Sequence, residues 1–543
     1  MNRRQFLKRG ALGAGATALT GAAAQDATVS AQRVTAWDRT ADVVIAGAGA
    51  SGLCAAIAAR DRGASVVVID QNHDIGGHAM VSGGRIPLGG GTRLQKKYGI
   101  VDSADQVYLD HTSARNAELR FSDRELVRVW ADENAATFDF LLDNGVEFQE
   151  VAPTLVNEGT VPRLFITKVY SDDLSVTING SPGSGLVRAL EKSARAKGVE
   201  ILLRHSLTRV VRESPSAGRV QGIVAEVAGK PVTIRARKGV ILATGGFTSN
   251  VEFRRMFDPR LTEEYQVAGE PWSRQTADGE LAALAVGAAL WGTSNVASER
   301  GRTVTKTRHI GARYGYVNLR WHPNSPMFAR AGGSGLTVRS YQDFVCVNQW
   351  GKRFGNELDE TYDFLNACLG RHDNDGKNGR ANGGGPIWAV FDADAVSREK
   401  WDPRPPNVDP NGYFFTADTI AELARAIANP YQRQPMSPRT LEETIAKYNS
   451  SVDAGTDPEF GRPKLMFKIE RPPFYAAWAT PILHDALAGL RTNIRCEVLD
   501  IHGRAISGLY CAGESAGGFA LHGLPRVTVF GRIAGREAAG ART

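Results

Sequence analysis

The sequence predicts an α/β fold in which a parallel sheet with flanking helices is interrupted by an inserted α+β domain. A strand, a glycine turn, a helix and a second strand follow one another within residues 42–70. Apolar runs that end in glycine turns recur at residues 239–247 and 510–514, as expected for further strands of one sheet. Between them, residues 317–483 are richer in proline, asparagine, glycine and aromatic residues, which indicates a second domain inserted into the first.

The first unit contains a glycine-rich turn with the spacing G-x-G-x-x-G. Gly47 suits a tight turn, Gly49 lets a pyrophosphate approach the backbone, and Gly52 allows the helix to pack closely on the strand. The N-terminus of the helix offers N–H groups and a positive dipole to phosphate. Asp70, at the end of the second strand, is placed to accept a ribose hydroxyl. Strand, turn, helix and acid occur in the right order, so the segment is predicted to bind a dinucleotide in a Rossmann-like domain.

The N-terminal segment has the features of a twin-arginine export signal. Arg3 and Arg4 precede a mildly apolar Ala/Gly run that ends in three alanines at 22–24. We predict that residues 1–24 are removed and that the protein folds before export, to a periplasmic or otherwise exported location. Loss of four basic residues lowers the net charge from +7 to about +3, which gives no case for nucleic-acid binding. No later run reaches about 18 apolar residues, so no membrane span is expected.

The five cysteines are scattered along the chain and form no C-x-x-C or C-x-x-C-H motif. The pattern indicates neither a zinc ribbon nor an attached c-type haem, and no metal site is predicted. A bridge between Cys496 and Cys511 is one interpretation, but buried free thiols are favoured because export after folding requires a structure that forms without disulfides.

The remaining elements follow from hydrophobic periodicity and from turn signals. Residues 104–146 read as two helices, 185–197 as another, and the last helix covers about 524–539. Short apolar runs between residues 199 and 237 read as a small sheet inserted in the first domain. Residues 275–279 open a further helix that extends to Leu290.

Taken together, the motifs resemble those of the flavoprotein family of soluble fumarate reductases, succinate dehydrogenase flavoprotein subunits and 3-ketosteroid dehydrogenases. The resemblance covers about residues 41–539 and rests on GAGASG, GGH…SGG, ILATGGF, TADGE, GKRFGNE and GLYCAGES…FGRIAG. It implies FAD as cofactor, bound by a discontinuous domain of residues 36–316 and 484–543. It also implies that residues 317–483 form a capping domain, with substrate held between the cap and the flavin ring.

The same resemblance implies the cofactor contacts. Asp70 would hold the adenosine ribose, and the segment from Gly76 to Gly84 would line the flavin. A covalent link to the flavin through His78 is a weaker alternative, because its offset from Gly83-Gly84 does not match the linked subfamily. The predicted cofactor residues are Gly47, Gly49, Ala50, Ser51, Gly52, Asp70, Gly76, Gly77, His78, Ser82, Gly83, Gly84, Ala243, Thr244, Gly245, Gly246, Asp278, Gly513, Glu514, His522, Gly523 and Leu524.

For catalysis the resemblance is selective. His322 and His484 match the two histidines that touch substrate in the family, and Arg339 is a further candidate. The acid of the fumarate reductases is an arginine, but Thr361 stands at its position, and Leu336 replaces the glutamate of its proton relay. Tyr362, next to Thr361, is the natural substitute if the protein follows the ketosteroid dehydrogenases.

The C-terminal motif leaves one arginine ambiguous. His522-Gly523-Leu524-Pro525-Arg526 resembles the motif whose arginine clamps a carboxylate, yet it lies about two helical turns too close to Phe530-Gly531-Arg532. Aligned from the later motif, His522 and Gly523 fall at a helix N-terminus under the flavin pyrimidine, and Arg526 falls in the first turn. Arg526 therefore stays an open candidate for substrate contact.

These features predict a flavin-dependent oxidoreductase that makes or reduces a C–C double bond next to a carbonyl or carboxyl group. A dehydrogenase of a cyclic, steroid-like ketone is slightly favoured by Tyr362. The alternative is an enoate reductase like the fumarate and urocanate enzymes, and a non-catalytic flavin-binding protein is a third hypothesis. Only one dinucleotide fingerprint is present, so electrons are expected to pass to or from a separate carrier, such as a quinone or a cytochrome.

Overall fold

The computed structural model describes residues 34, 36–113, 122–156, 159–171, 177–291, 304–315, 321–359, 362–370, 377 and 379–542. The predicted export signal, residues 1–24, and Thr361 lie outside the described residues. Residues 36–543 form one compact unit. None of the helices in the described part of the chain is long and apolar enough to span a membrane.

The central sheet joins strands from both ends of the chain. Its strand order is β20-β21-β8-β1-β2-β5, with β6 and β7 paired beside β8. β1 pairs in parallel with β2 on one side and with β8 on the other, and β21 continues the parallel set beyond β8. The strands are β1 (Arg39–Ala46), β2 (Val66–Asp70), β5 (Glu200–Leu203), β6 (Ser206–Ser214), β7 (Ala217–Val227), β8 (Lys230–Leu242), β20 (Glu497–Leu499) and β21 (Ala505–Cys511).

Alternate residues of β1 face two different cores. Val43 and Ile45 pack in the cluster formed with the helices, whereas Val44 and Ala46 pack with residues of β6 and β7 and of helix α10 (Asp278–Leu284). This is the two-residue period of a strand buried on both faces, which explains its uninterrupted apolar sequence. The helices on the first face are α2 (Ala50–Arg60), α6 (Arg124–Asp143), α8 (Pro182–Ala196) and α17 (Leu524–Gly540).

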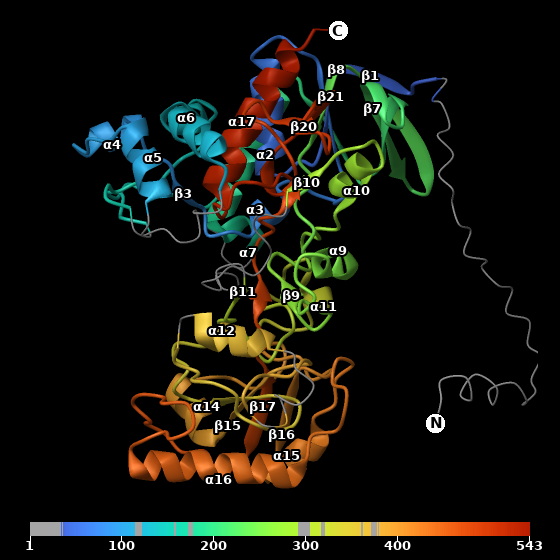
Figure 1. Cartoon of the computed structure of the whole chain (residues 1–543). Coiled ribbons are helices and arrows are strands. Elements are labelled where there is room, and N and C mark those ends of the chain that lie inside the picture. Colours follow the sequence, from blue (N-terminus) through green and yellow to red (C-terminus); the bar gives the residue numbers. More distant parts are fainter. Residues whose placement is uncertain are drawn as a thin grey trace, which may run out of the picture. The chain divides into compact units, whose positions relative to one another are not determined.

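Glycines bring the last helix against the first one. A Cβ at Gly531 would lie 2.4 Å from the carbonyl oxygen of Ser51, and a Cβ at Gly535 would lie 2.1 Å from that of Ala55. Only glycine permits so close an approach of α17 to α2, and this explains the F-G-R-I-A-G motif. Figure 1 shows the two helices side by side next to the strands.

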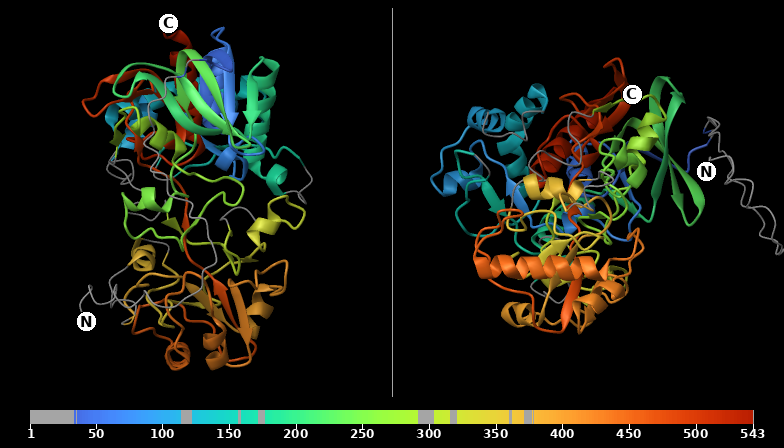
Figure 2. Two further views of the ribbon diagram at one scale, coloured as in Figure 1. Left: turned by 90° about the vertical axis from the view of Figure 1, so that its right-hand side faces the viewer. Right: turned by 60° about the horizontal axis from the view of Figure 1, so that its bottom comes forward.

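A second, four-stranded antiparallel sheet lies within the predicted capping segment, in the order β14-β15-β17-β16. The helices and strands of this segment are β14 (Val345–Val347), α12 (Tyr362–Leu369), β15 (Trp388–Phe391), α14 (Ala393–Glu399), β16 (Phe414–Ala417), α15 (Ile420–Ala426), α16 (Pro438–Ala454) and β17 (Phe474–Trp478). Among them, α15 packs against both α16 and β16 (Figures 1 and 2). The predicted fold class, α/β with an inserted α+β domain, is confirmed; the domain boundaries remain predictions.

Short elements connect the two sheets and flank the helices. β18 (Ile482–Leu483) pairs with β11 (Val304–Thr305) and with β9 (Gln266–Val267). The others are α3 (Gly77–Met80), β3 (Arg85–Pro87), α4 (Arg93–Lys97), α5 (Ala104–Thr112), β4 (Leu164–Ile166), α7 (Thr177–Gly180), α9 (Val251–Arg255), β10 (Leu290–Trp291), β12 (His309–Ile310), α11 (Phe328–Ala331), β13 (Leu336–Thr337) and β19 (Gly489–Leu490).

One local prediction was wrong. The strands between residues 200 and 237 are not a separate inserted sheet, because β5 pairs with β2 and β8 pairs with β1 in the central sheet. The predicted strands at 230–237 and 239–243 form a single strand, β8, whose register against β1 shifts at a bulge between Ala41 and Val43. The bulge lets one strand serve both the parallel sheet and the antiparallel β6–β7–β8 meander.

Candidate cofactor and active site

The carboxyl ends of β1, β2 and β8 open onto a cavity of about 660 Å³. This is the position at which parallel α/β sheets bind ligands. Both ends of the chain contribute to its wall. The main lining segments are residues 46–51, 69–72, 76–83, 243–245, 271–278, 484–485 and 521–527, with Gly513 and Glu514.

The nucleotide end of the cavity has the features that a bound diphosphate requires. α2 begins at Gly49 without a side-chain cap, so its first N–H groups are open to a ligand. A Cβ at Gly49 would meet no protein atom closer than 3.9 Å and would occupy the cavity instead. The buried hydroxyl of Ser51, in the first turn, has no hydrogen-bond partner among the described residues. These donors and this space fit the diphosphate of FAD.

Two of the three fingerprint glycines act by packing. A Cβ at Gly47, where φ is +107°, would lie 2.1 Å from the carbonyl oxygen of Ala243, and one at Gly52 would lie 1.9 Å from that of Gly47. Asp70 lines the cavity and accepts hydrogen bonds from the N–H groups of Ala48 (2.7 Å) and Asn72 (2.8 Å). These bonds fix its carboxylate at the end of β2, beside the glycine turn.

The far end of the cavity holds three histidines and two carboxyl groups. His484 Nδ1 lies 3.0 Å from Asp485 Oδ1, and His522 Nδ1 contacts Asp485 Oδ2. The rings of His484 and His522 are 4.4 Å apart, and those of His78 and His484 are 5.9 Å apart, centroid to centroid. His78 Nδ1 lies 3.9 Å from a carboxylate oxygen of Glu514. We call these five residues the His/Asp cluster.

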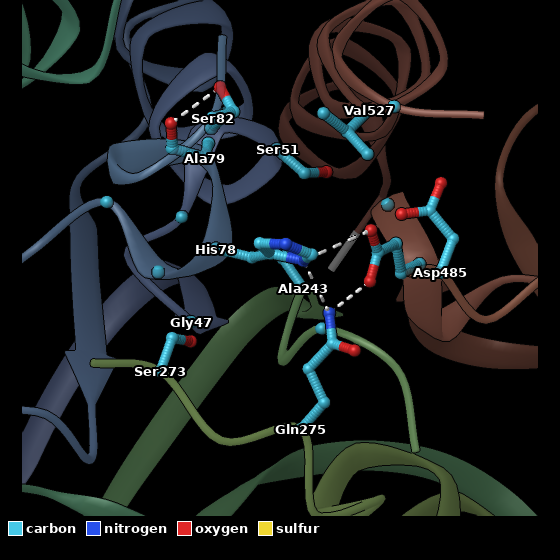
Figure 3. A pocket seen from close by; sticks show the side chains of 18 of the residues that line it. Gly47, Ser51, His78, Ala79, Ser82, Ala243, Ser273, Gln275, Asp485 and Val527 are labelled. Atoms are coloured by element: carbon cyan, nitrogen blue, oxygen red, sulfur yellow. Dashed lines mark hydrogen bonds and ion pairs between the residues drawn. The ribbon is translucent and has the colours of Figure 1, made fainter. Parts of the chain in front are cut away.

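A glutamine links two members of the cluster. Gln275 donates to Glu514, and its Nε2 lies 3.5 Å from His78 Nδ1. Figure 3 shows His78, Gln275 and Asp485 gathered around this part of the cavity, with dashed lines at the contacts of His78 and Gln275. Gln275 with His78 and Glu514 forms one bonded group, and Asp485 with its two histidines forms another. The two groups meet where ligand atoms of His78, Asp485 and Glu514 lie within 4.8 Å of one another. Their residues come from α3, the loop before α10, the segment after β18, the turn after β21 and the segment just before α17.

The surroundings act in opposite directions on the two carboxyl groups. Burial raises the pKa of Glu514 well above its usual range, and the neighbouring Asp485 raises it further. Burial also opposes ionisation of Asp485, but His522 and His484 together hold its pKa well below the ordinary value. The site therefore favours the neutral acid at Glu514 and the carboxylate at Asp485.

Burial disfavours the charged form of two of the histidines. It lowers the pKa of His78 to about 4, with a smaller contribution from His484. Burial and His522 also lower the pKa of His484, against the opposing effect of its hydrogen bond to Asp485. His484 is 13% exposed and His522 is 51% exposed, so protons reach His522 more easily.

Most of the residues predicted to contact the cofactor line this cavity. Exceptions are Gly52, Gly84 and Gly246, which pack behind it: a Cβ at Gly84 would lie 2.2 Å from Thr167 Oγ1, and one at Gly246 would lie 2.5 Å from the side chain of Ala486. The predicted cofactor residues that line it are Gly47, Gly49, Ala50, Ser51, Asp70, Gly76, Gly77, His78, Ser82, Gly83, Ala243, Thr244, Gly245, Asp278, Gly513, Glu514, His522, Gly523 and Leu524.

Among the predicted catalytic side chains that the structure describes, only His484 lines the cavity. His322 lies in a turn where its Nδ1 accepts from the N–H of Asn324 at 3.2 Å, and Arg339 is exposed. Neither lines the cavity. Tyr362 begins α12, but its side chain lies outside the described residues.

Arg526 is buried beneath the cavity rather than exposed to it. Its guanidinium donates to the carbonyl oxygens of Ala486 (3.3 Å) and Gly513 (3.1 Å), and also to that of Ala516. The side chain is 2% exposed. This geometry favours a brace between α17 and two loops of the cavity wall over a clamp on a substrate.

Sequence reasoning missed several lining residues. Asp485 stands inside a motif that drew attention only to His484, and Gln275 is the first of the predicted helix-opening residues. Thr305 and Arg330 also line the cavity, and the buried hydroxyl of Thr305 has no partner among the described residues. The available signals were adjacency to His484 for Asp485 and a distance of three positions from Asp278 for Gln275.

Comparisons with known proteins agree with this site. The family model of the FAD binding domain matches residues 42–526. Over 540 residues the chain is 28% identical to the acrylate reductase flavoprotein subunit of Shewanella woodyi, covering 97% of this chain and 94% of that protein.

Two solved structures share the fold. The open conformation of a flavocytochrome c3 fumarate reductase aligns with a TM-score of 0.66 and 24% identity, over 93% of this chain and 79% of that one. The 3-ketosteroid-delta4-(5alpha)-dehydrogenase from Rhodococcus jostii RHA1, in complex with 4-androstene-3,17-dione, aligns with a TM-score of 0.57 and 26% identity, over 93% of this chain and 98% of that one.

Proposed function

This chain belongs to the FAD binding domain family, and from that premise we propose that it reduces a carbon–carbon double bond conjugated to a carboxyl or carbonyl group. It is an FAD-dependent oxidoreductase that acts on CH–CH bonds. The choice of an enoate reductase reverses the slight preference that the sequence motifs gave to a cyclic ketone.

The observation that carries this proposal is the His/Asp cluster at the far end of the cavity. A steroid-like substrate is bound chiefly by apolar surface, with few polar groups. Here the imidazoles of His78, His484 and His522 and the carboxyl groups of Asp485 and Glu514 stand together. Such a set suits a small substrate whose carboxylate or carbonyl needs hydrogen-bond donors, and the similarity to an acrylate reductase subunit supports the same choice.

The residues have separable tasks in this scheme. Bound FAD, when reduced, supplies the hydride. The open N–H groups at the start of α2, with Ser51 and Asp70, hold the nucleotide half of the cofactor. His484 and His522, each fixed by one oxygen of Asp485, orient their Nε2 atoms away from that carboxylate. Those atoms are the groups that the chain offers to a substrate beside the ring.

A dehydrogenase of a cyclic ketone remains the second candidate. The missing arginine at position 361 and the tyrosine that follows it favour this function, as does the similarity to the Rhodococcus jostii enzyme. The two candidate functions differ in the direction of the reaction and in the class of substrate. A third hypothesis, a flavoprotein without turnover, predicts that no compound of either class changes the flavin spectrum.

One anaerobic experiment separates these functions. The purified flavoprotein is photoreduced, and its flavin absorbance is followed after addition of acrylate, fumarate, urocanate, cinnamate or 4-androstene-3,17-dione. In parallel, the oxidised protein receives saturated cyclic ketones and an artificial acceptor. We expect rapid reoxidation by at least one carboxylate. Bleaching by ketones with no response to any carboxylate would instead establish the ketone dehydrogenase.

We further propose that the protein is exported through the twin-arginine pathway and receives electrons from an external carrier, such as a quinol or a reduced cytochrome. The Arg3-Arg4 pair and the single dinucleotide fingerprint support this. Replacing both arginines by lysine should leave a flavin-loaded precursor in the cytoplasm. Fractionation of cells that produce each form tests the prediction, and equal export of the two would contradict it.

A further inference from the structure

The structure offers a source for the proton that enoate reduction requires. Adding two hydrogens across a C=C bond takes one hydride and one proton, delivered to adjacent carbons. At position 361 the sequence has a threonine where the related fumarate reductases are expected to have their acid, and at 336 it has a leucine in place of the relay glutamate. The protein must therefore move the proton by other groups.

We infer that His484 donates this proton. Asp485 orients the imidazole of His484 and stabilises its positive charge, and His522 connects the pair to water. The inference rests on the proposed function and deepens it by naming the acid. His484 lines the cavity and is 13% exposed, so its imidazole reaches the ligand space. His484 is thus a catalytic residue, and Asp485 a positioning residue.

The bonds at Asp485 fix which nitrogen of His484 reacts. Its Nδ1 lies 3.0 Å from Asp485 Oδ1 and is held there as N–H, so Nε2 is the nitrogen that acts on the substrate. FAD, when bound and reduced, would supply the hydride and its electron pair for the β-carbon. The Nε2–H bond of protonated His484 breaks while a C–H bond forms at the α-carbon. His484 is left neutral, with its Nδ1–H still on Asp485.

The proton is then replaced from solvent through the more exposed imidazole. His522 contacts the other oxygen of Asp485, its ring lies 4.4 Å from that of His484, and it is 51% exposed. Its position just before Gly523, where α17 starts, also places it in the cavity wall. The carboxylate of Asp485 contacts both imidazoles, and its negative charge stabilises the protonated form of either ring.

Other titratable groups face His484, Asp485 and His522 and affect their protonation. His78 approaches from α3, Glu514 from the turn after β21, and Arg526 from the first turn of α17. Burial raises the pKa of Glu514 and so favours its neutral form. Burial and the neighbouring His522 disfavour protonation of His484, whereas Asp485 favours it. Removing the carboxylate of Asp485 should therefore lower the pKa of His484.

Stopped-flow reoxidation of the photoreduced holoenzyme tests this inference, with the best carboxylate substrate of the wild-type protein and, separately, with ferricyanide, which needs no proton on carbon. We expect His484→Gln to slow reoxidation by the substrate at least 100-fold and to leave the ferricyanide rate within twofold. In Asp485→Asn, the rate of reoxidation by the substrate should begin to fall with rising pH about one pH unit earlier than in the wild type. At pH 7 this rate should be tenfold lower than that of the wild type. His502→Gln, at an exposed turn, serves as the control and should match the wild type.

Flavin absorbance and stoichiometry show whether each variant is loaded. If His484→Gln loses flavin, His484→Ala with added imidazole replaces it, and a rate that rises with imidazole concentration supports the inference. A loaded His484 variant that reacts as fast as the wild type overturns it and leaves the proposed function intact. A wild-type enzyme that no carboxylate or ketone reoxidises overturns both.

Discussion

The imidazoles of His484 and His522 contact different oxygens of one carboxylate, that of Asp485, although 38 positions separate them in the sequence. One histidine follows the β18 strand and the other precedes α17, so the shared carboxylate joins two segments of the cavity wall. Both imidazoles lie on segments of the predicted second part of the FAD-binding domain, residues 484–543.

The fingerprint glycines should fail in different ways when replaced. In Gly49→Val the new side chain enters the cavity, so we expect a folded protein that retains less than about a tenth of the wild-type flavin. In Gly52→Ala the Cβ would collide with the carbonyl oxygen of Gly47 at 1.9 Å, and thermal stability should fall instead. Flavin absorbance per chain and circular dichroism melting measure the two effects. Normal flavin content in Gly49→Val would refute the assignment of the nucleotide end.

Replacing Arg526 tests whether its side chain stabilises the cavity wall or binds the carboxylate of a substrate. Replacing it with methionine removes its hydrogen bonds to three carbonyl oxygens of the cavity wall, of which that of Gly513 keeps a bond from the N–H of Ala516. We expect a cost of about 2–4 kcal/mol in the free energy of unfolding. A substrate clamp would instead raise KM for carboxylates with little loss of stability. Urea unfolding and steady-state kinetics on the same preparation decide between them.

Tyr362 distinguishes the two candidate reactions. The ketone-dehydrogenase hypothesis predicts that Tyr362→Phe slows turnover at least tenfold while FAD stays bound, because a proton donor is lost with little change of volume. With His484 as donor, we expect less than a threefold change in enoate reduction. Steady-state rates with a carboxylate and with a cyclic ketone, on flavin-loaded protein, give the answer.

Acid should destabilise the fold partly through His111. Burial lowers the pKa of His111 to about 4, against an ordinary value of 6.5. Between pH 6.5 and about pH 4, His111 is protonated in the unfolded chain but not in the folded protein. The free energy of unfolding therefore falls across this window, as the pH is lowered, by up to about 3 kcal/mol. His111→Gln should flatten the dependence of the melting temperature on pH between 6.5 and 4.5. The exposed His502→Gln should leave the slope unchanged.

All five cysteines are buried and unpaired, which confirms the prediction of free thiols. Burial raises the pKa of the Cys54 thiol to about 12, and burial raises that of Cys346 as well. We therefore expect the native holoenzyme to react with no thiol reagent over about an hour at pH 8, and all five groups to react in guanidinium chloride. Fast labelling of a native thiol would show that its site opens.

The sequence was most informative where local physics fixes the structure. The unit from β1 to Asp70 is defined by apolar runs and by glycines, two of which, Gly47 and Gly52, leave no room for a Cβ. It was found within a few residues of its observed limits. The strand β8 was divided in two because Arg237 and Lys238 interrupt its apolar pattern. At that point β8 has one residue more than β1, and pairing with β1 and β7, a long-range feature, makes it one strand.

The catalytic end was harder to predict because its geometry depends on distant segments. The sequence left Arg526 an open candidate for substrate contact, because its motif suggested a clamp and its spacing did not. In the structure it donates to carbonyl groups 10 to 40 positions away. Asp485 carries no signal of its own, since a single aspartate beside a histidine is common. Its role became visible only when His522 was found on its other oxygen.

The packing of α17 on α2 has a consequence for biosynthesis. Gly531 and Gly535 lie against the helix that follows the fingerprint, and residues 521–525 line the cavity. A nascent chain therefore cannot complete its prosthetic-group pocket until the ribosome has made residues 521–535. Flavin loading would then report translation past this segment, and a chain shortened by a nonsense codon before residue 521 should emerge colourless.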